Sequence, residues 1–214
     1  MKNKLVYGVG VNDADYSVTS YKRLAGKVTQ QICPFYSRWK DMLKRCYNES
    51  AFVSHPTYKS CHVCEDWLTF SKFKQWMEGQ IWKGLQLDKD LLVTGNKVYS
   101  PTTCAFVPHK INTVVGKIDA ENNGSGYIGV YVEKRGKVLK YSAQVCNTRK
   151  RFGVYSDAFS AHKSWQLEKA KEIEAAICWY ALQTCFRADV AESLTSKVWK
   201  LRLENSMNIK TERI

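Results

Sequence analysis

The chain has 214 residues, of which 44% are hydrophobic and 13% aromatic. This composition excludes a mainly disordered protein, because disordered chains hold too few apolar residues to bury a core. Thirty-three Lys and Arg against twenty Asp and Glu give a formal net charge of +13, which favours a polyanionic partner, with nucleic acid as the first candidate.

From the sequence we expect neither a membrane span nor a secretory leader. No stretch reaches the roughly 18 apolar residues of a transmembrane helix, and the first residues, MKNKLVYGVG, lack the apolar core of a signal peptide. We therefore expect a cytoplasmic protein without a membrane partner, whose eight cysteines are reduced thiols.

The N-terminal part is expected to be helical after a polar arm. Residues 12–31 carry few periodic hydrophobic residues, and we expect a loosely packed arm there. From Cys33 onward, apolar residues recur at helical spacing, which predicts a helix with one buried face. A second helix is predicted after Glu65. The residues expected on the buried faces of these two helices are Trp39, Met42, Leu43 and Cys46, then Phe70, Phe73 and Met77.

Cys61 and Cys64 have the Cys-x-x-Cys spacing with which two thiolates can hold one zinc ion. A structural zinc site needs a second pair of ligands, and the chain has no second Cys-x-x-Cys. We therefore expect two free thiols here, not a structural zinc.

The segment from Leu87 to Asn112 has the densest set of oxygen and nitrogen side chains between two hydrophobic runs. Asp88 and Asp90 are predicted to lie on one short strand and to point to the same face. His109 and Asn112 follow about twenty residues later. A carboxylate, a nearby base and a distant amide oxygen can hold one hard divalent cation on a phosphate. The alternative is that the two carboxylates merely solvate the end of a strand.

This segment resembles the ββα-metal core of HNH endonucleases, and the whole chain resembles phage-encoded HNH-family proteins with a second DNA-binding domain, which would place it in the host cytosol. The resemblance implies a Mg²⁺ or Mn²⁺ ion held by Asp88 and Asn112. Lys89, however, stands where that family has its general-base His, and a protonated lysine cannot accept a proton from water. Asp90, His109 or a lysine with a lowered pKa would then activate water, with Lys89 otherwise neutralising phosphate charge; alternatively, the site has lost catalysis.

Residues 116–126 are rich in Gly, Asn and Ser and are predicted to be a linker. Beyond it, three strand-like runs at 127–133, 140–147 and 150–156 precede a helix from about Ala158, with Ser156 or Asp157 as its N-cap. Three antiparallel strands backed by one helix leave one sheet face free. Such a face can enter the major groove of DNA.

The three-strand segment is similar to the APETALA or ethylene-response-factor type of DNA-binding domain, on the runs Gly129-Val130-Tyr131, Tyr141-Ser142-Ala143 and Phe152-Gly153-Val154-Tyr155. In that family alternate sheet residues contact bases and phosphates. Carried over, these positions are Tyr131, Glu133, Gln144, Cys146, Arg149 and Arg151.

Charge supports the same interpretation, because residues 134–151 include seven basic residues and no acid. The basic residues are Lys134, Arg135, Lys137, Lys140, Arg149, Lys150 and Arg151. Gln144 can pair with adenine, and Arg149 or Arg151 with guanine or phosphate. The alternative is a merely solvated hairpin.

After residue 185 we expect one more helix, with Leu194, Val198 and Leu201 aligned, and fraying of the last ten residues. The predicted fold is α+β: a helical N-terminal region with a ββα-metal core, then a three-stranded antiparallel sheet packed on a helix. The predicted domains are a nuclease-like module at 1–115, the linker at 116–126, the sheet and helix at 127–185, and a C-terminal helix and tail at 186–214.

The function expected from the sequence is that of a sequence-directed protein that binds double-stranded DNA and nicks or cleaves it. The alternative is a degenerate HNH-like phage protein that binds or regulates without cleavage. RNA or a host protein are further candidate partners, and competition between duplex and single strands separates the RNA case.

Overall fold

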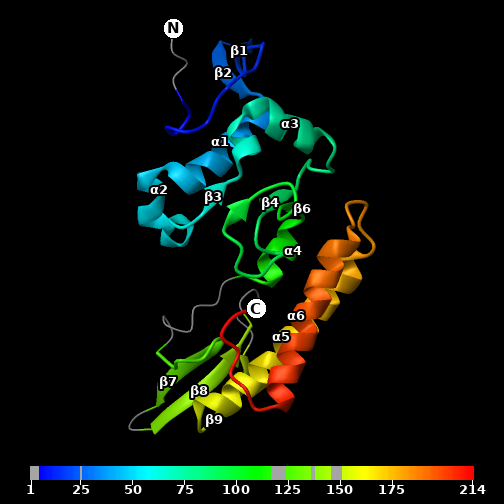
Figure 1. Ribbon diagram of the computed structural model, residues 1–214. Helices are drawn as coiled ribbons and strands as arrows, with labels where there is room; N and C mark the ends of the chain where they lie inside the picture. The colour runs from blue at the N-terminus through cyan, green and yellow to red at the C-terminus, as the bar shows by residue number, and fades with distance from the viewer. Residues whose placement is uncertain (1–4, 25, 117–123, 136–137, 146–150) are drawn as a thin grey trace. The chain divides into compact units, whose positions relative to one another are not determined.

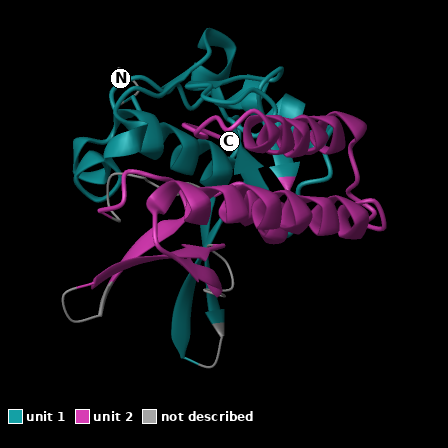
Figure 2. Cartoon of the chain, turned by 90° about the horizontal axis from the view of Figure 1, so that it is seen from below, with its two compact units in different colours: residues 1–106 teal, residues 107–214 magenta. Residues whose placement is uncertain are grey.

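The computed structural model shows an α+β protein and describes residues 5–24, 26–116, 124–135, 138–145 and 151–214. The chain divides into two compact units (Figure 2), which are Met1–Phe106 and Val107–Ile214. None of the described helices is both long enough and apolar enough to cross a membrane.

The division between the units lies ahead of the predicted linker. α4 (His109–Val114) packs on α5 (Ala158–Tyr180), and it buries Ile111 and Val114. Lys110 adds a cation-π contact, with its Nζ 4.6 Å from the centre of the Trp179 ring. α4 therefore belongs to the second unit, whereas the sequence assigned it to the first.

Unit 1 begins with an antiparallel hairpin of β1 (Thr19–Leu24) and β2 (Lys27–Ile32), where the sequence predicted only a loose arm. Its strands are rich in β-branched and aromatic residues, and Gly26 adopts a φ of +78° in the turn. The Cys33 N–H donates to the Val18 carbonyl at 2.8 Å and closes the base of the hairpin. Figure 1 shows the hairpin extending from the helices of unit 1.

The core of unit 1 lies between two helices that the sequence predicted. α1 (Pro34–Tyr47) and α3 (Phe70–Glu78) pack together, and both predicted apolar stripes are confirmed as buried. The Trp39 indole N–H donates to the Trp67 carbonyl at 2.7 Å, so the polar atom of this buried ring is satisfied.

Short elements complete unit 1. β3 pairs in parallel with β5, and β4 pairs with β6. The remaining elements are α2 (Glu49–Ser54), η1 (Pro56–Tyr58), β3 (His62–Val63), η2 (Glu65–Leu68), β4 (Gln86–Asp88), β5 (Val98–Tyr99) and β6 (Ala105–Val107).

Unit 2 contains the predicted three-stranded antiparallel sheet, in the order β7-β8-β9. The strands are β7 (Val130–Arg135), β8 (Val138–Gln144) and β9 (Arg151–Tyr155). α5 packs on this sheet, and Asp157 is confirmed as its N-cap, since Asp157 Oδ1 accepts the Ser160 N–H at 2.8 Å.

The last helix, α6 (Ala188–Ser206), packs along α5 and buries Leu194, Val198 and Leu201 as predicted. The prediction that the last ten residues fray is wrong. Thr211 is fully buried, and its N–H donates to His162 Nε2 at 3.0 Å. Buried hydrogen bonds to α5 therefore hold the C-terminal segment, which local sequence composition does not reveal.

Candidate functional site

The β7–β9 sheet has one face packed on α5 and one face turned away from α5, and we call the second the outer face. Side chains alternate along strands, so residues opposite one another in register share a face. Val130 is opposite Ala143, and both are fully buried on the side of α5. The β8–β9 pairing is irregular between Ser142 and Gln144, and beyond this irregularity Arg151 is opposite Gln144. With it, the register places seven residues on the other side, which are Tyr131, Glu133, Lys140, Ser142, Gln144, Arg151 and Val154.

The outer face combines apolar and polar contact groups. Tyr131 is 37% exposed and Val154 49% exposed, and in register they flank the small, buried Ser142 of the central strand. Gln144 is opposite Arg151 in register, and the Arg151 guanidinium itself contacts Glu133. These residues offer stacking area and hydrogen-bonding groups on one side of the sheet.

An ion pair crosses the sheet between its two edge strands. Arg151 Nη1 lies 3.0 Å from Glu133 Oε1, with the arginine side chain 58% exposed and the glutamate 14%. A pair this open to solvent contributes little to stability. It does hold the Arg151 guanidinium at Glu133, and a guanidinium has further N–H donors to offer a ligand.

Several of the predicted basic positions cannot be placed on this face. Lys137, Arg149 and Lys150 lie outside the described residues, as does Cys146. Lys134 and Arg135 lie on β7, where only their backbone is described. The outer face thus holds Tyr131, Glu133, Lys140, Gln144 and Arg151 of the predicted DNA-contact set. Sequence reasoning did not single out Val154, because the irregular pairing of β9 breaks simple alternation there.

The packing of α5 determines which face stays open. Gly129 has a φ of +72°, and a Cβ atom there would overlap the Trp165 ring of α5. His162 Nδ1 lies 2.9 Å from the Ile128 carbonyl, which fixes the chain entering β7. The glycine and the two ring side chains therefore hold the start of the sheet against α5.

The predicted metal loop in unit 1 has a different geometry from the expected one. β4 ends at Asp88, and Asp90 lies beyond it, so the expectation that both carboxylates share one strand face is wrong. Asp88 Oδ1 accepts the N–H groups of Asp90 at 3.0 Å and Leu91 at 2.6 Å. Aspartate commonly closes turns in this way. Burial raises the pKa of the Asp88 carboxyl, and the nearby Asp90 charge adds to the rise.

Lys89 turns into the same loop and is only 5% exposed. Its Nζ donates to the Asn96 carbonyl at 3.3 Å and lies 3.2 Å from Asp90 Oδ2. The Tyr58 ring centre is 5.9 Å from the ammonium. A phosphate could reach this ammonium only if the loop opened.

Asn96, which the sequence marked only as part of a turn, organises the loop. Its Nδ2 donates to the carbonyls of Lys89 at 2.5 Å and Val98 at 2.7 Å, and its Oδ1 accepts the Val98 N–H at 3.1 Å. The signal available in the sequence was the Gly-Asn turn, since asparagine side chains often bond to nearby backbone.

The other two residues of the predicted nuclease site, His109 and Asn112, lie on α4 in unit 2, while Asp88, Lys89 and Asp90 lie together in unit 1. Among the described residues, no group of three or more His, Cys, Asp and Glu side chains could hold a metal ion. In the loop itself, Asp88 Oδ1 accepts two backbone N–H groups and Asp90 Oδ2 pairs with Lys89, which leaves one oxygen of each carboxylate without such a partner among the described residues. Mg²⁺ or Mn²⁺ stays a prediction.

The cysteines of unit 1 lie mostly in its core. Cys61 is buried and its Sγ donates to the Thr57 carbonyl at 3.7 Å, while Cys64 is half-buried beyond β3. Burial raises the pKa of the Cys46 and Cys104 thiols to about 12 each. These two thiols are therefore core residues and not reactive ones.

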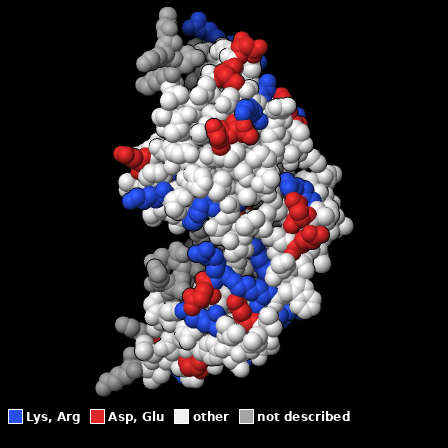
Figure 3. All heavy atoms as spheres, in the orientation of Figure 1, with Lys and Arg blue, Asp and Glu red and all other residues white. Residues whose placement is uncertain are grey.

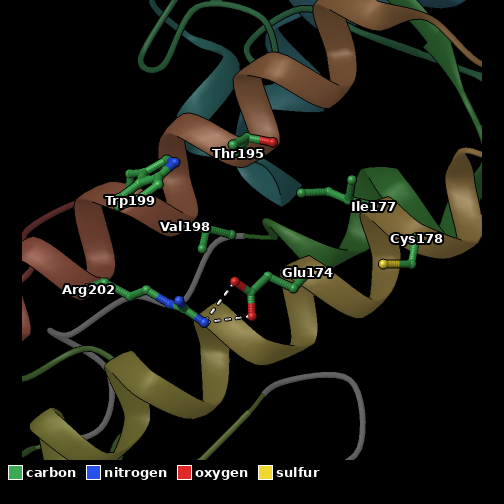
Figure 4. Close-up of a pocket in the computed structure, with 7 residues that line it drawn as sticks. All are labelled: Glu174, Ile177, Cys178, Thr195, Val198, Trp199 and Arg202. Carbon is green, nitrogen blue, oxygen red and sulfur yellow. Dashed lines mark hydrogen bonds and ion pairs between the residues drawn. The ribbon is translucent and has the colours of Figure 1, made fainter.

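A small pocket of about 240 Å³ opens between α5 and α6 (Figure 4). Arg202 Nη2 lies 2.8 Å from both carboxylate oxygens of Glu174, so the charges at the pocket cancel. The lower part of Figure 3 shows basic and acidic side chains interleaved over these helices. This side of unit 2 is therefore less suited to bind a polyanion than the segment 134–151, which has basic residues and no acidic one.

Comparison with protein families, characterised proteins and solved structures finds no match to this chain. Its own residues therefore carry the functional inference.

Proposed function

We propose that this protein binds double-stranded DNA through the outer face of the β7–β9 sheet. The observation that supports this most directly is the register of the strands. It places Tyr131, Lys140, Gln144 and Arg151 on the outer face, away from α5. The segment 134–151 that connects and forms these strands has seven basic residues and no acidic one.

The chemistry of this face suits a DNA groove. An amide and a guanidinium on one face can read base edges, because Gln pairs with adenine and Arg with guanine. Lysines at the sheet margin would contact phosphates, which position the protein without reading sequence. Glu133 holds Arg151 in place before binding, so less side-chain entropy is lost when DNA arrives.

The first test is fluorescence anisotropy of a labelled duplex at several salt concentrations, with Lys140→Gln/Gln144→Ala beside the unmodified chain. Loss of one phosphate contact should reduce the slope of log affinity against log salt by about 1, and loss of the Gln144 contact should cost about 1–3 kcal/mol on the preferred sequence. The control is Lys171→Gln, which removes one positive charge from α5. Lys171 Nζ lies 2.7 Å from Glu168 Oε1. Equal affinity of all three proteins would refute the proposal.

A second candidate function is metal-dependent DNA cleavage at the Asp88 loop. It is favoured by the order of elements, since β4 pairs with β6 and α4 follows β6 after one residue, as the HNH resemblance implies. In unit 1 this scheme uses Asp88 as a metal ligand and Asp90 to activate water, whereas the other two predicted residues, His109 and Asn112, belong to unit 2. The non-catalytic alternative is supported by Lys89, whose ammonium is buried against Asp90 and Asn96.

The cleavage test must separate a lost ligand from a collapsed loop. Asp88→Ala removes the acceptor for the Asp90 and Leu91 N–H groups, whereas Asp88→Asn retains an oxygen that can accept both. Supercoiled plasmid is therefore incubated with Mg²⁺, Mn²⁺ or EDTA and each variant. Metal-dependent nicking that is lost in Asp88→Asn, with its melting temperature unchanged, would support a nuclease. Nicking retained in that variant would contradict the predicted metal site.

A further inference from the structure

The β1–β2 hairpin is the least packed regular element of unit 1. Every residue of β2 is exposed, and no other described helix or strand packs extensively on either strand. An isolated two-stranded hairpin is at best marginally stable in water. The structure nevertheless closes its base, because the Cys33 N–H donates to Val18 and Ser17 Oγ donates to the Thr19 carbonyl at 2.6 Å.

The two faces of the hairpin carry different side chains. The register places Tyr21 opposite Gln30 and Arg23 opposite Val28, so these four residues share one face. Tyr21 is 68% exposed and Val28 56%. An aromatic ring, a guanidinium and an amide on one exposed face form a contact surface that the core of unit 1 does not use.

The charge of the hairpin is of one sign. Between Asp15 and Asp41 the chain has five basic residues and no acidic one, and three of the basic residues, Lys22, Arg23 and Lys27, lie in the hairpin. All three are exposed, and no acidic side chain among the residues that the structure describes pairs with them. Unpaired positive charge on an exposed element is complementary to a polyanion.

We propose that the β1–β2 hairpin is a second DNA-binding element, which enters the major groove as a two-stranded ribbon. The inference rests on the proposed function, since duplex DNA is the ligand, but it assigns a separate surface in unit 1. Two strands about 4.8 Å apart fit a major groove about 12 Å wide. Tyr21, Arg23 and Gln30 face the base edges, and the flexible stems of Lys22 and Lys27 near the turn reach the flanking phosphates.

The test measures binding of the full-length chain to a labelled 30-base-pair duplex by anisotropy across a salt series. The variant Lys22→Gln/Arg23→Gln/Lys27→Gln removes three charges from the hairpin, and Lys44→Gln/Lys59→Gln/Lys83→Gln removes three exposed lysines elsewhere in unit 1. We expect the hairpin variant to bind at least about tenfold more weakly at 0.1 M salt and its salt slope to fall by about 2 to 3, whereas the control changes neither appreciably. Equal effects of the two variants would show general charge attraction only and would overturn the proposal.

A second variant tests the contact face without changing the charge. Tyr21→Ala/Gln30→Ala should weaken binding severalfold and leave the salt slope unchanged, because it removes contacts with base edges but no phosphate contact. Neither residue belongs to the buried core, so the melting temperature should match that of the unmodified chain. Unchanged affinity of this variant would refute the placement of this face against the bases.

The sheet variant Lys140→Gln/Gln144→Ala, run in parallel, separates this proposal from the previous one. Weaker binding of the hairpin variant alone supports the hairpin and refutes the sheet, and weaker binding of the sheet variant alone does the reverse. Light scattering, which measures the oligomeric state, tests the alternative that the exposed strand edges pair with a second copy of the chain. A dimer that the hairpin variant loses, with DNA affinity unchanged, would overturn the DNA proposal.

Discussion

Replacing His162 with Phe should detach the C-terminal segment and remove a pH dependence from unit 2. His162 is fully buried between two backbone partners: its Nδ1 lies 2.9 Å from the Ile128 carbonyl, and its Nε2 accepts the Thr211 N–H at 3.0 Å. The imidazole must therefore be neutral, with its proton on Nδ1, because an imidazolium has no acceptor. It also stacks on Trp165, with ring centres 5.3 Å apart, and Phe retains most of that contact.

The loss of stability in His162→Phe follows from the two backbone groups that lose their hydrogen bonds. A buried donor or acceptor left unsatisfied costs about 1–3 kcal/mol, so the orphaned Thr211 N–H and Ile128 carbonyl should together destabilise the fold by about 2–6 kcal/mol. The Gln166 amide would retain the segment in part, because its Nε2 donates to the Ile209 carbonyl at 2.9 Å. The loss should therefore appear as early cleavage near the C-terminus in limited proteolysis as well as in urea unfolding.

The pH dependence has a definite sign. Burial lowers the pKa of His162 in the folded protein, with Lys210 lowering it further and Glu204 and Glu212 opposing. In the unfolded chain the pKa is about 6.5, so below that pH the unfolded state binds the proton more readily. The contribution of His162 is complete above about pH 6.5 and is lost as the pH falls from there toward the folded-state pKa, at up to about 1.4 kcal/mol per pH unit.

Urea unfolding monitored by circular dichroism between pH 8 and pH 5.5 measures both effects. The unmodified chain should lose stability below about pH 6.5, and His162→Phe should be less stable but have a flatter profile. Thr211→Ser, which retains the backbone N–H, is the matched control and should keep the pH dependence. Parallel profiles for the unmodified chain and His162→Phe would refute the assigned hydrogen bonds.

Three further predictions concern the two units separately. Gly129→Ala should destabilise unit 2 by about 3 kcal/mol or more, because φ there is +72° and the new Cβ would overlap Trp165; a urea midpoint within error of the parent would contradict this close approach. Asn96→Ala should destabilise unit 1 by about 2–4 kcal/mol through the loss of three hydrogen bonds, and hydrogen exchange should accelerate in residues 88–99; unaltered exchange would show that the loop does not depend on Asn96. Under native conditions an alkylating reagent should label Cys178, which is exposed, before Cys46, because burial raises the pKa of the Cys46 thiol to about 12. Peptide mass spectrometry measures the order of labelling, and labelling of Cys46 first would contradict its burial.

The sequence pattern predicts those elements whose structure is determined by residues close together in the chain, within one or two helical turns. The α1 stripe ending at Cys46, the α3 stripe and the N-cap at Asp157 were all found as predicted. The C-terminal segment was not, because its order depends on Thr211 meeting His162, which lies 49 residues earlier. Composition alone made the segment look like a frayed end, since contacts at that separation leave no periodic signal.

The N-terminal arm shows the same limit for strands. Residues 12–31 have no alternation of apolar and polar side chains because neither face of the hairpin is buried, and alternation is the pattern from which half-buried strands are predicted. Three-stranded sheets with one buried face, such as β7–β9, retain that alternation and were found. An exposed ribbon is therefore the kind of strand pair that sequence reasoning misses.

The Asp88 loop shows why an oxygen-rich motif does not by itself define a metal site. Asp88 and Asn96 use their side-chain oxygens and amide to satisfy backbone groups in a segment with little regular structure. The same residue types would serve a cation, so the sequence cannot separate the two roles, whereas hydrogen-bond geometry can. Lys89 fits the structural role as well, because a buried ammonium needs the Asp90 carboxylate and the Asn96 carbonyl that this loop supplies. A cleavage activity requires the charged Asp88 carboxylate to bind a cation, whereas the turn needs only one oxygen that accepts the Asp90 and Leu91 N–H groups. The Asp88→Asn variant, which can keep those backbone partners, is therefore the decisive comparison between the two proposed functions.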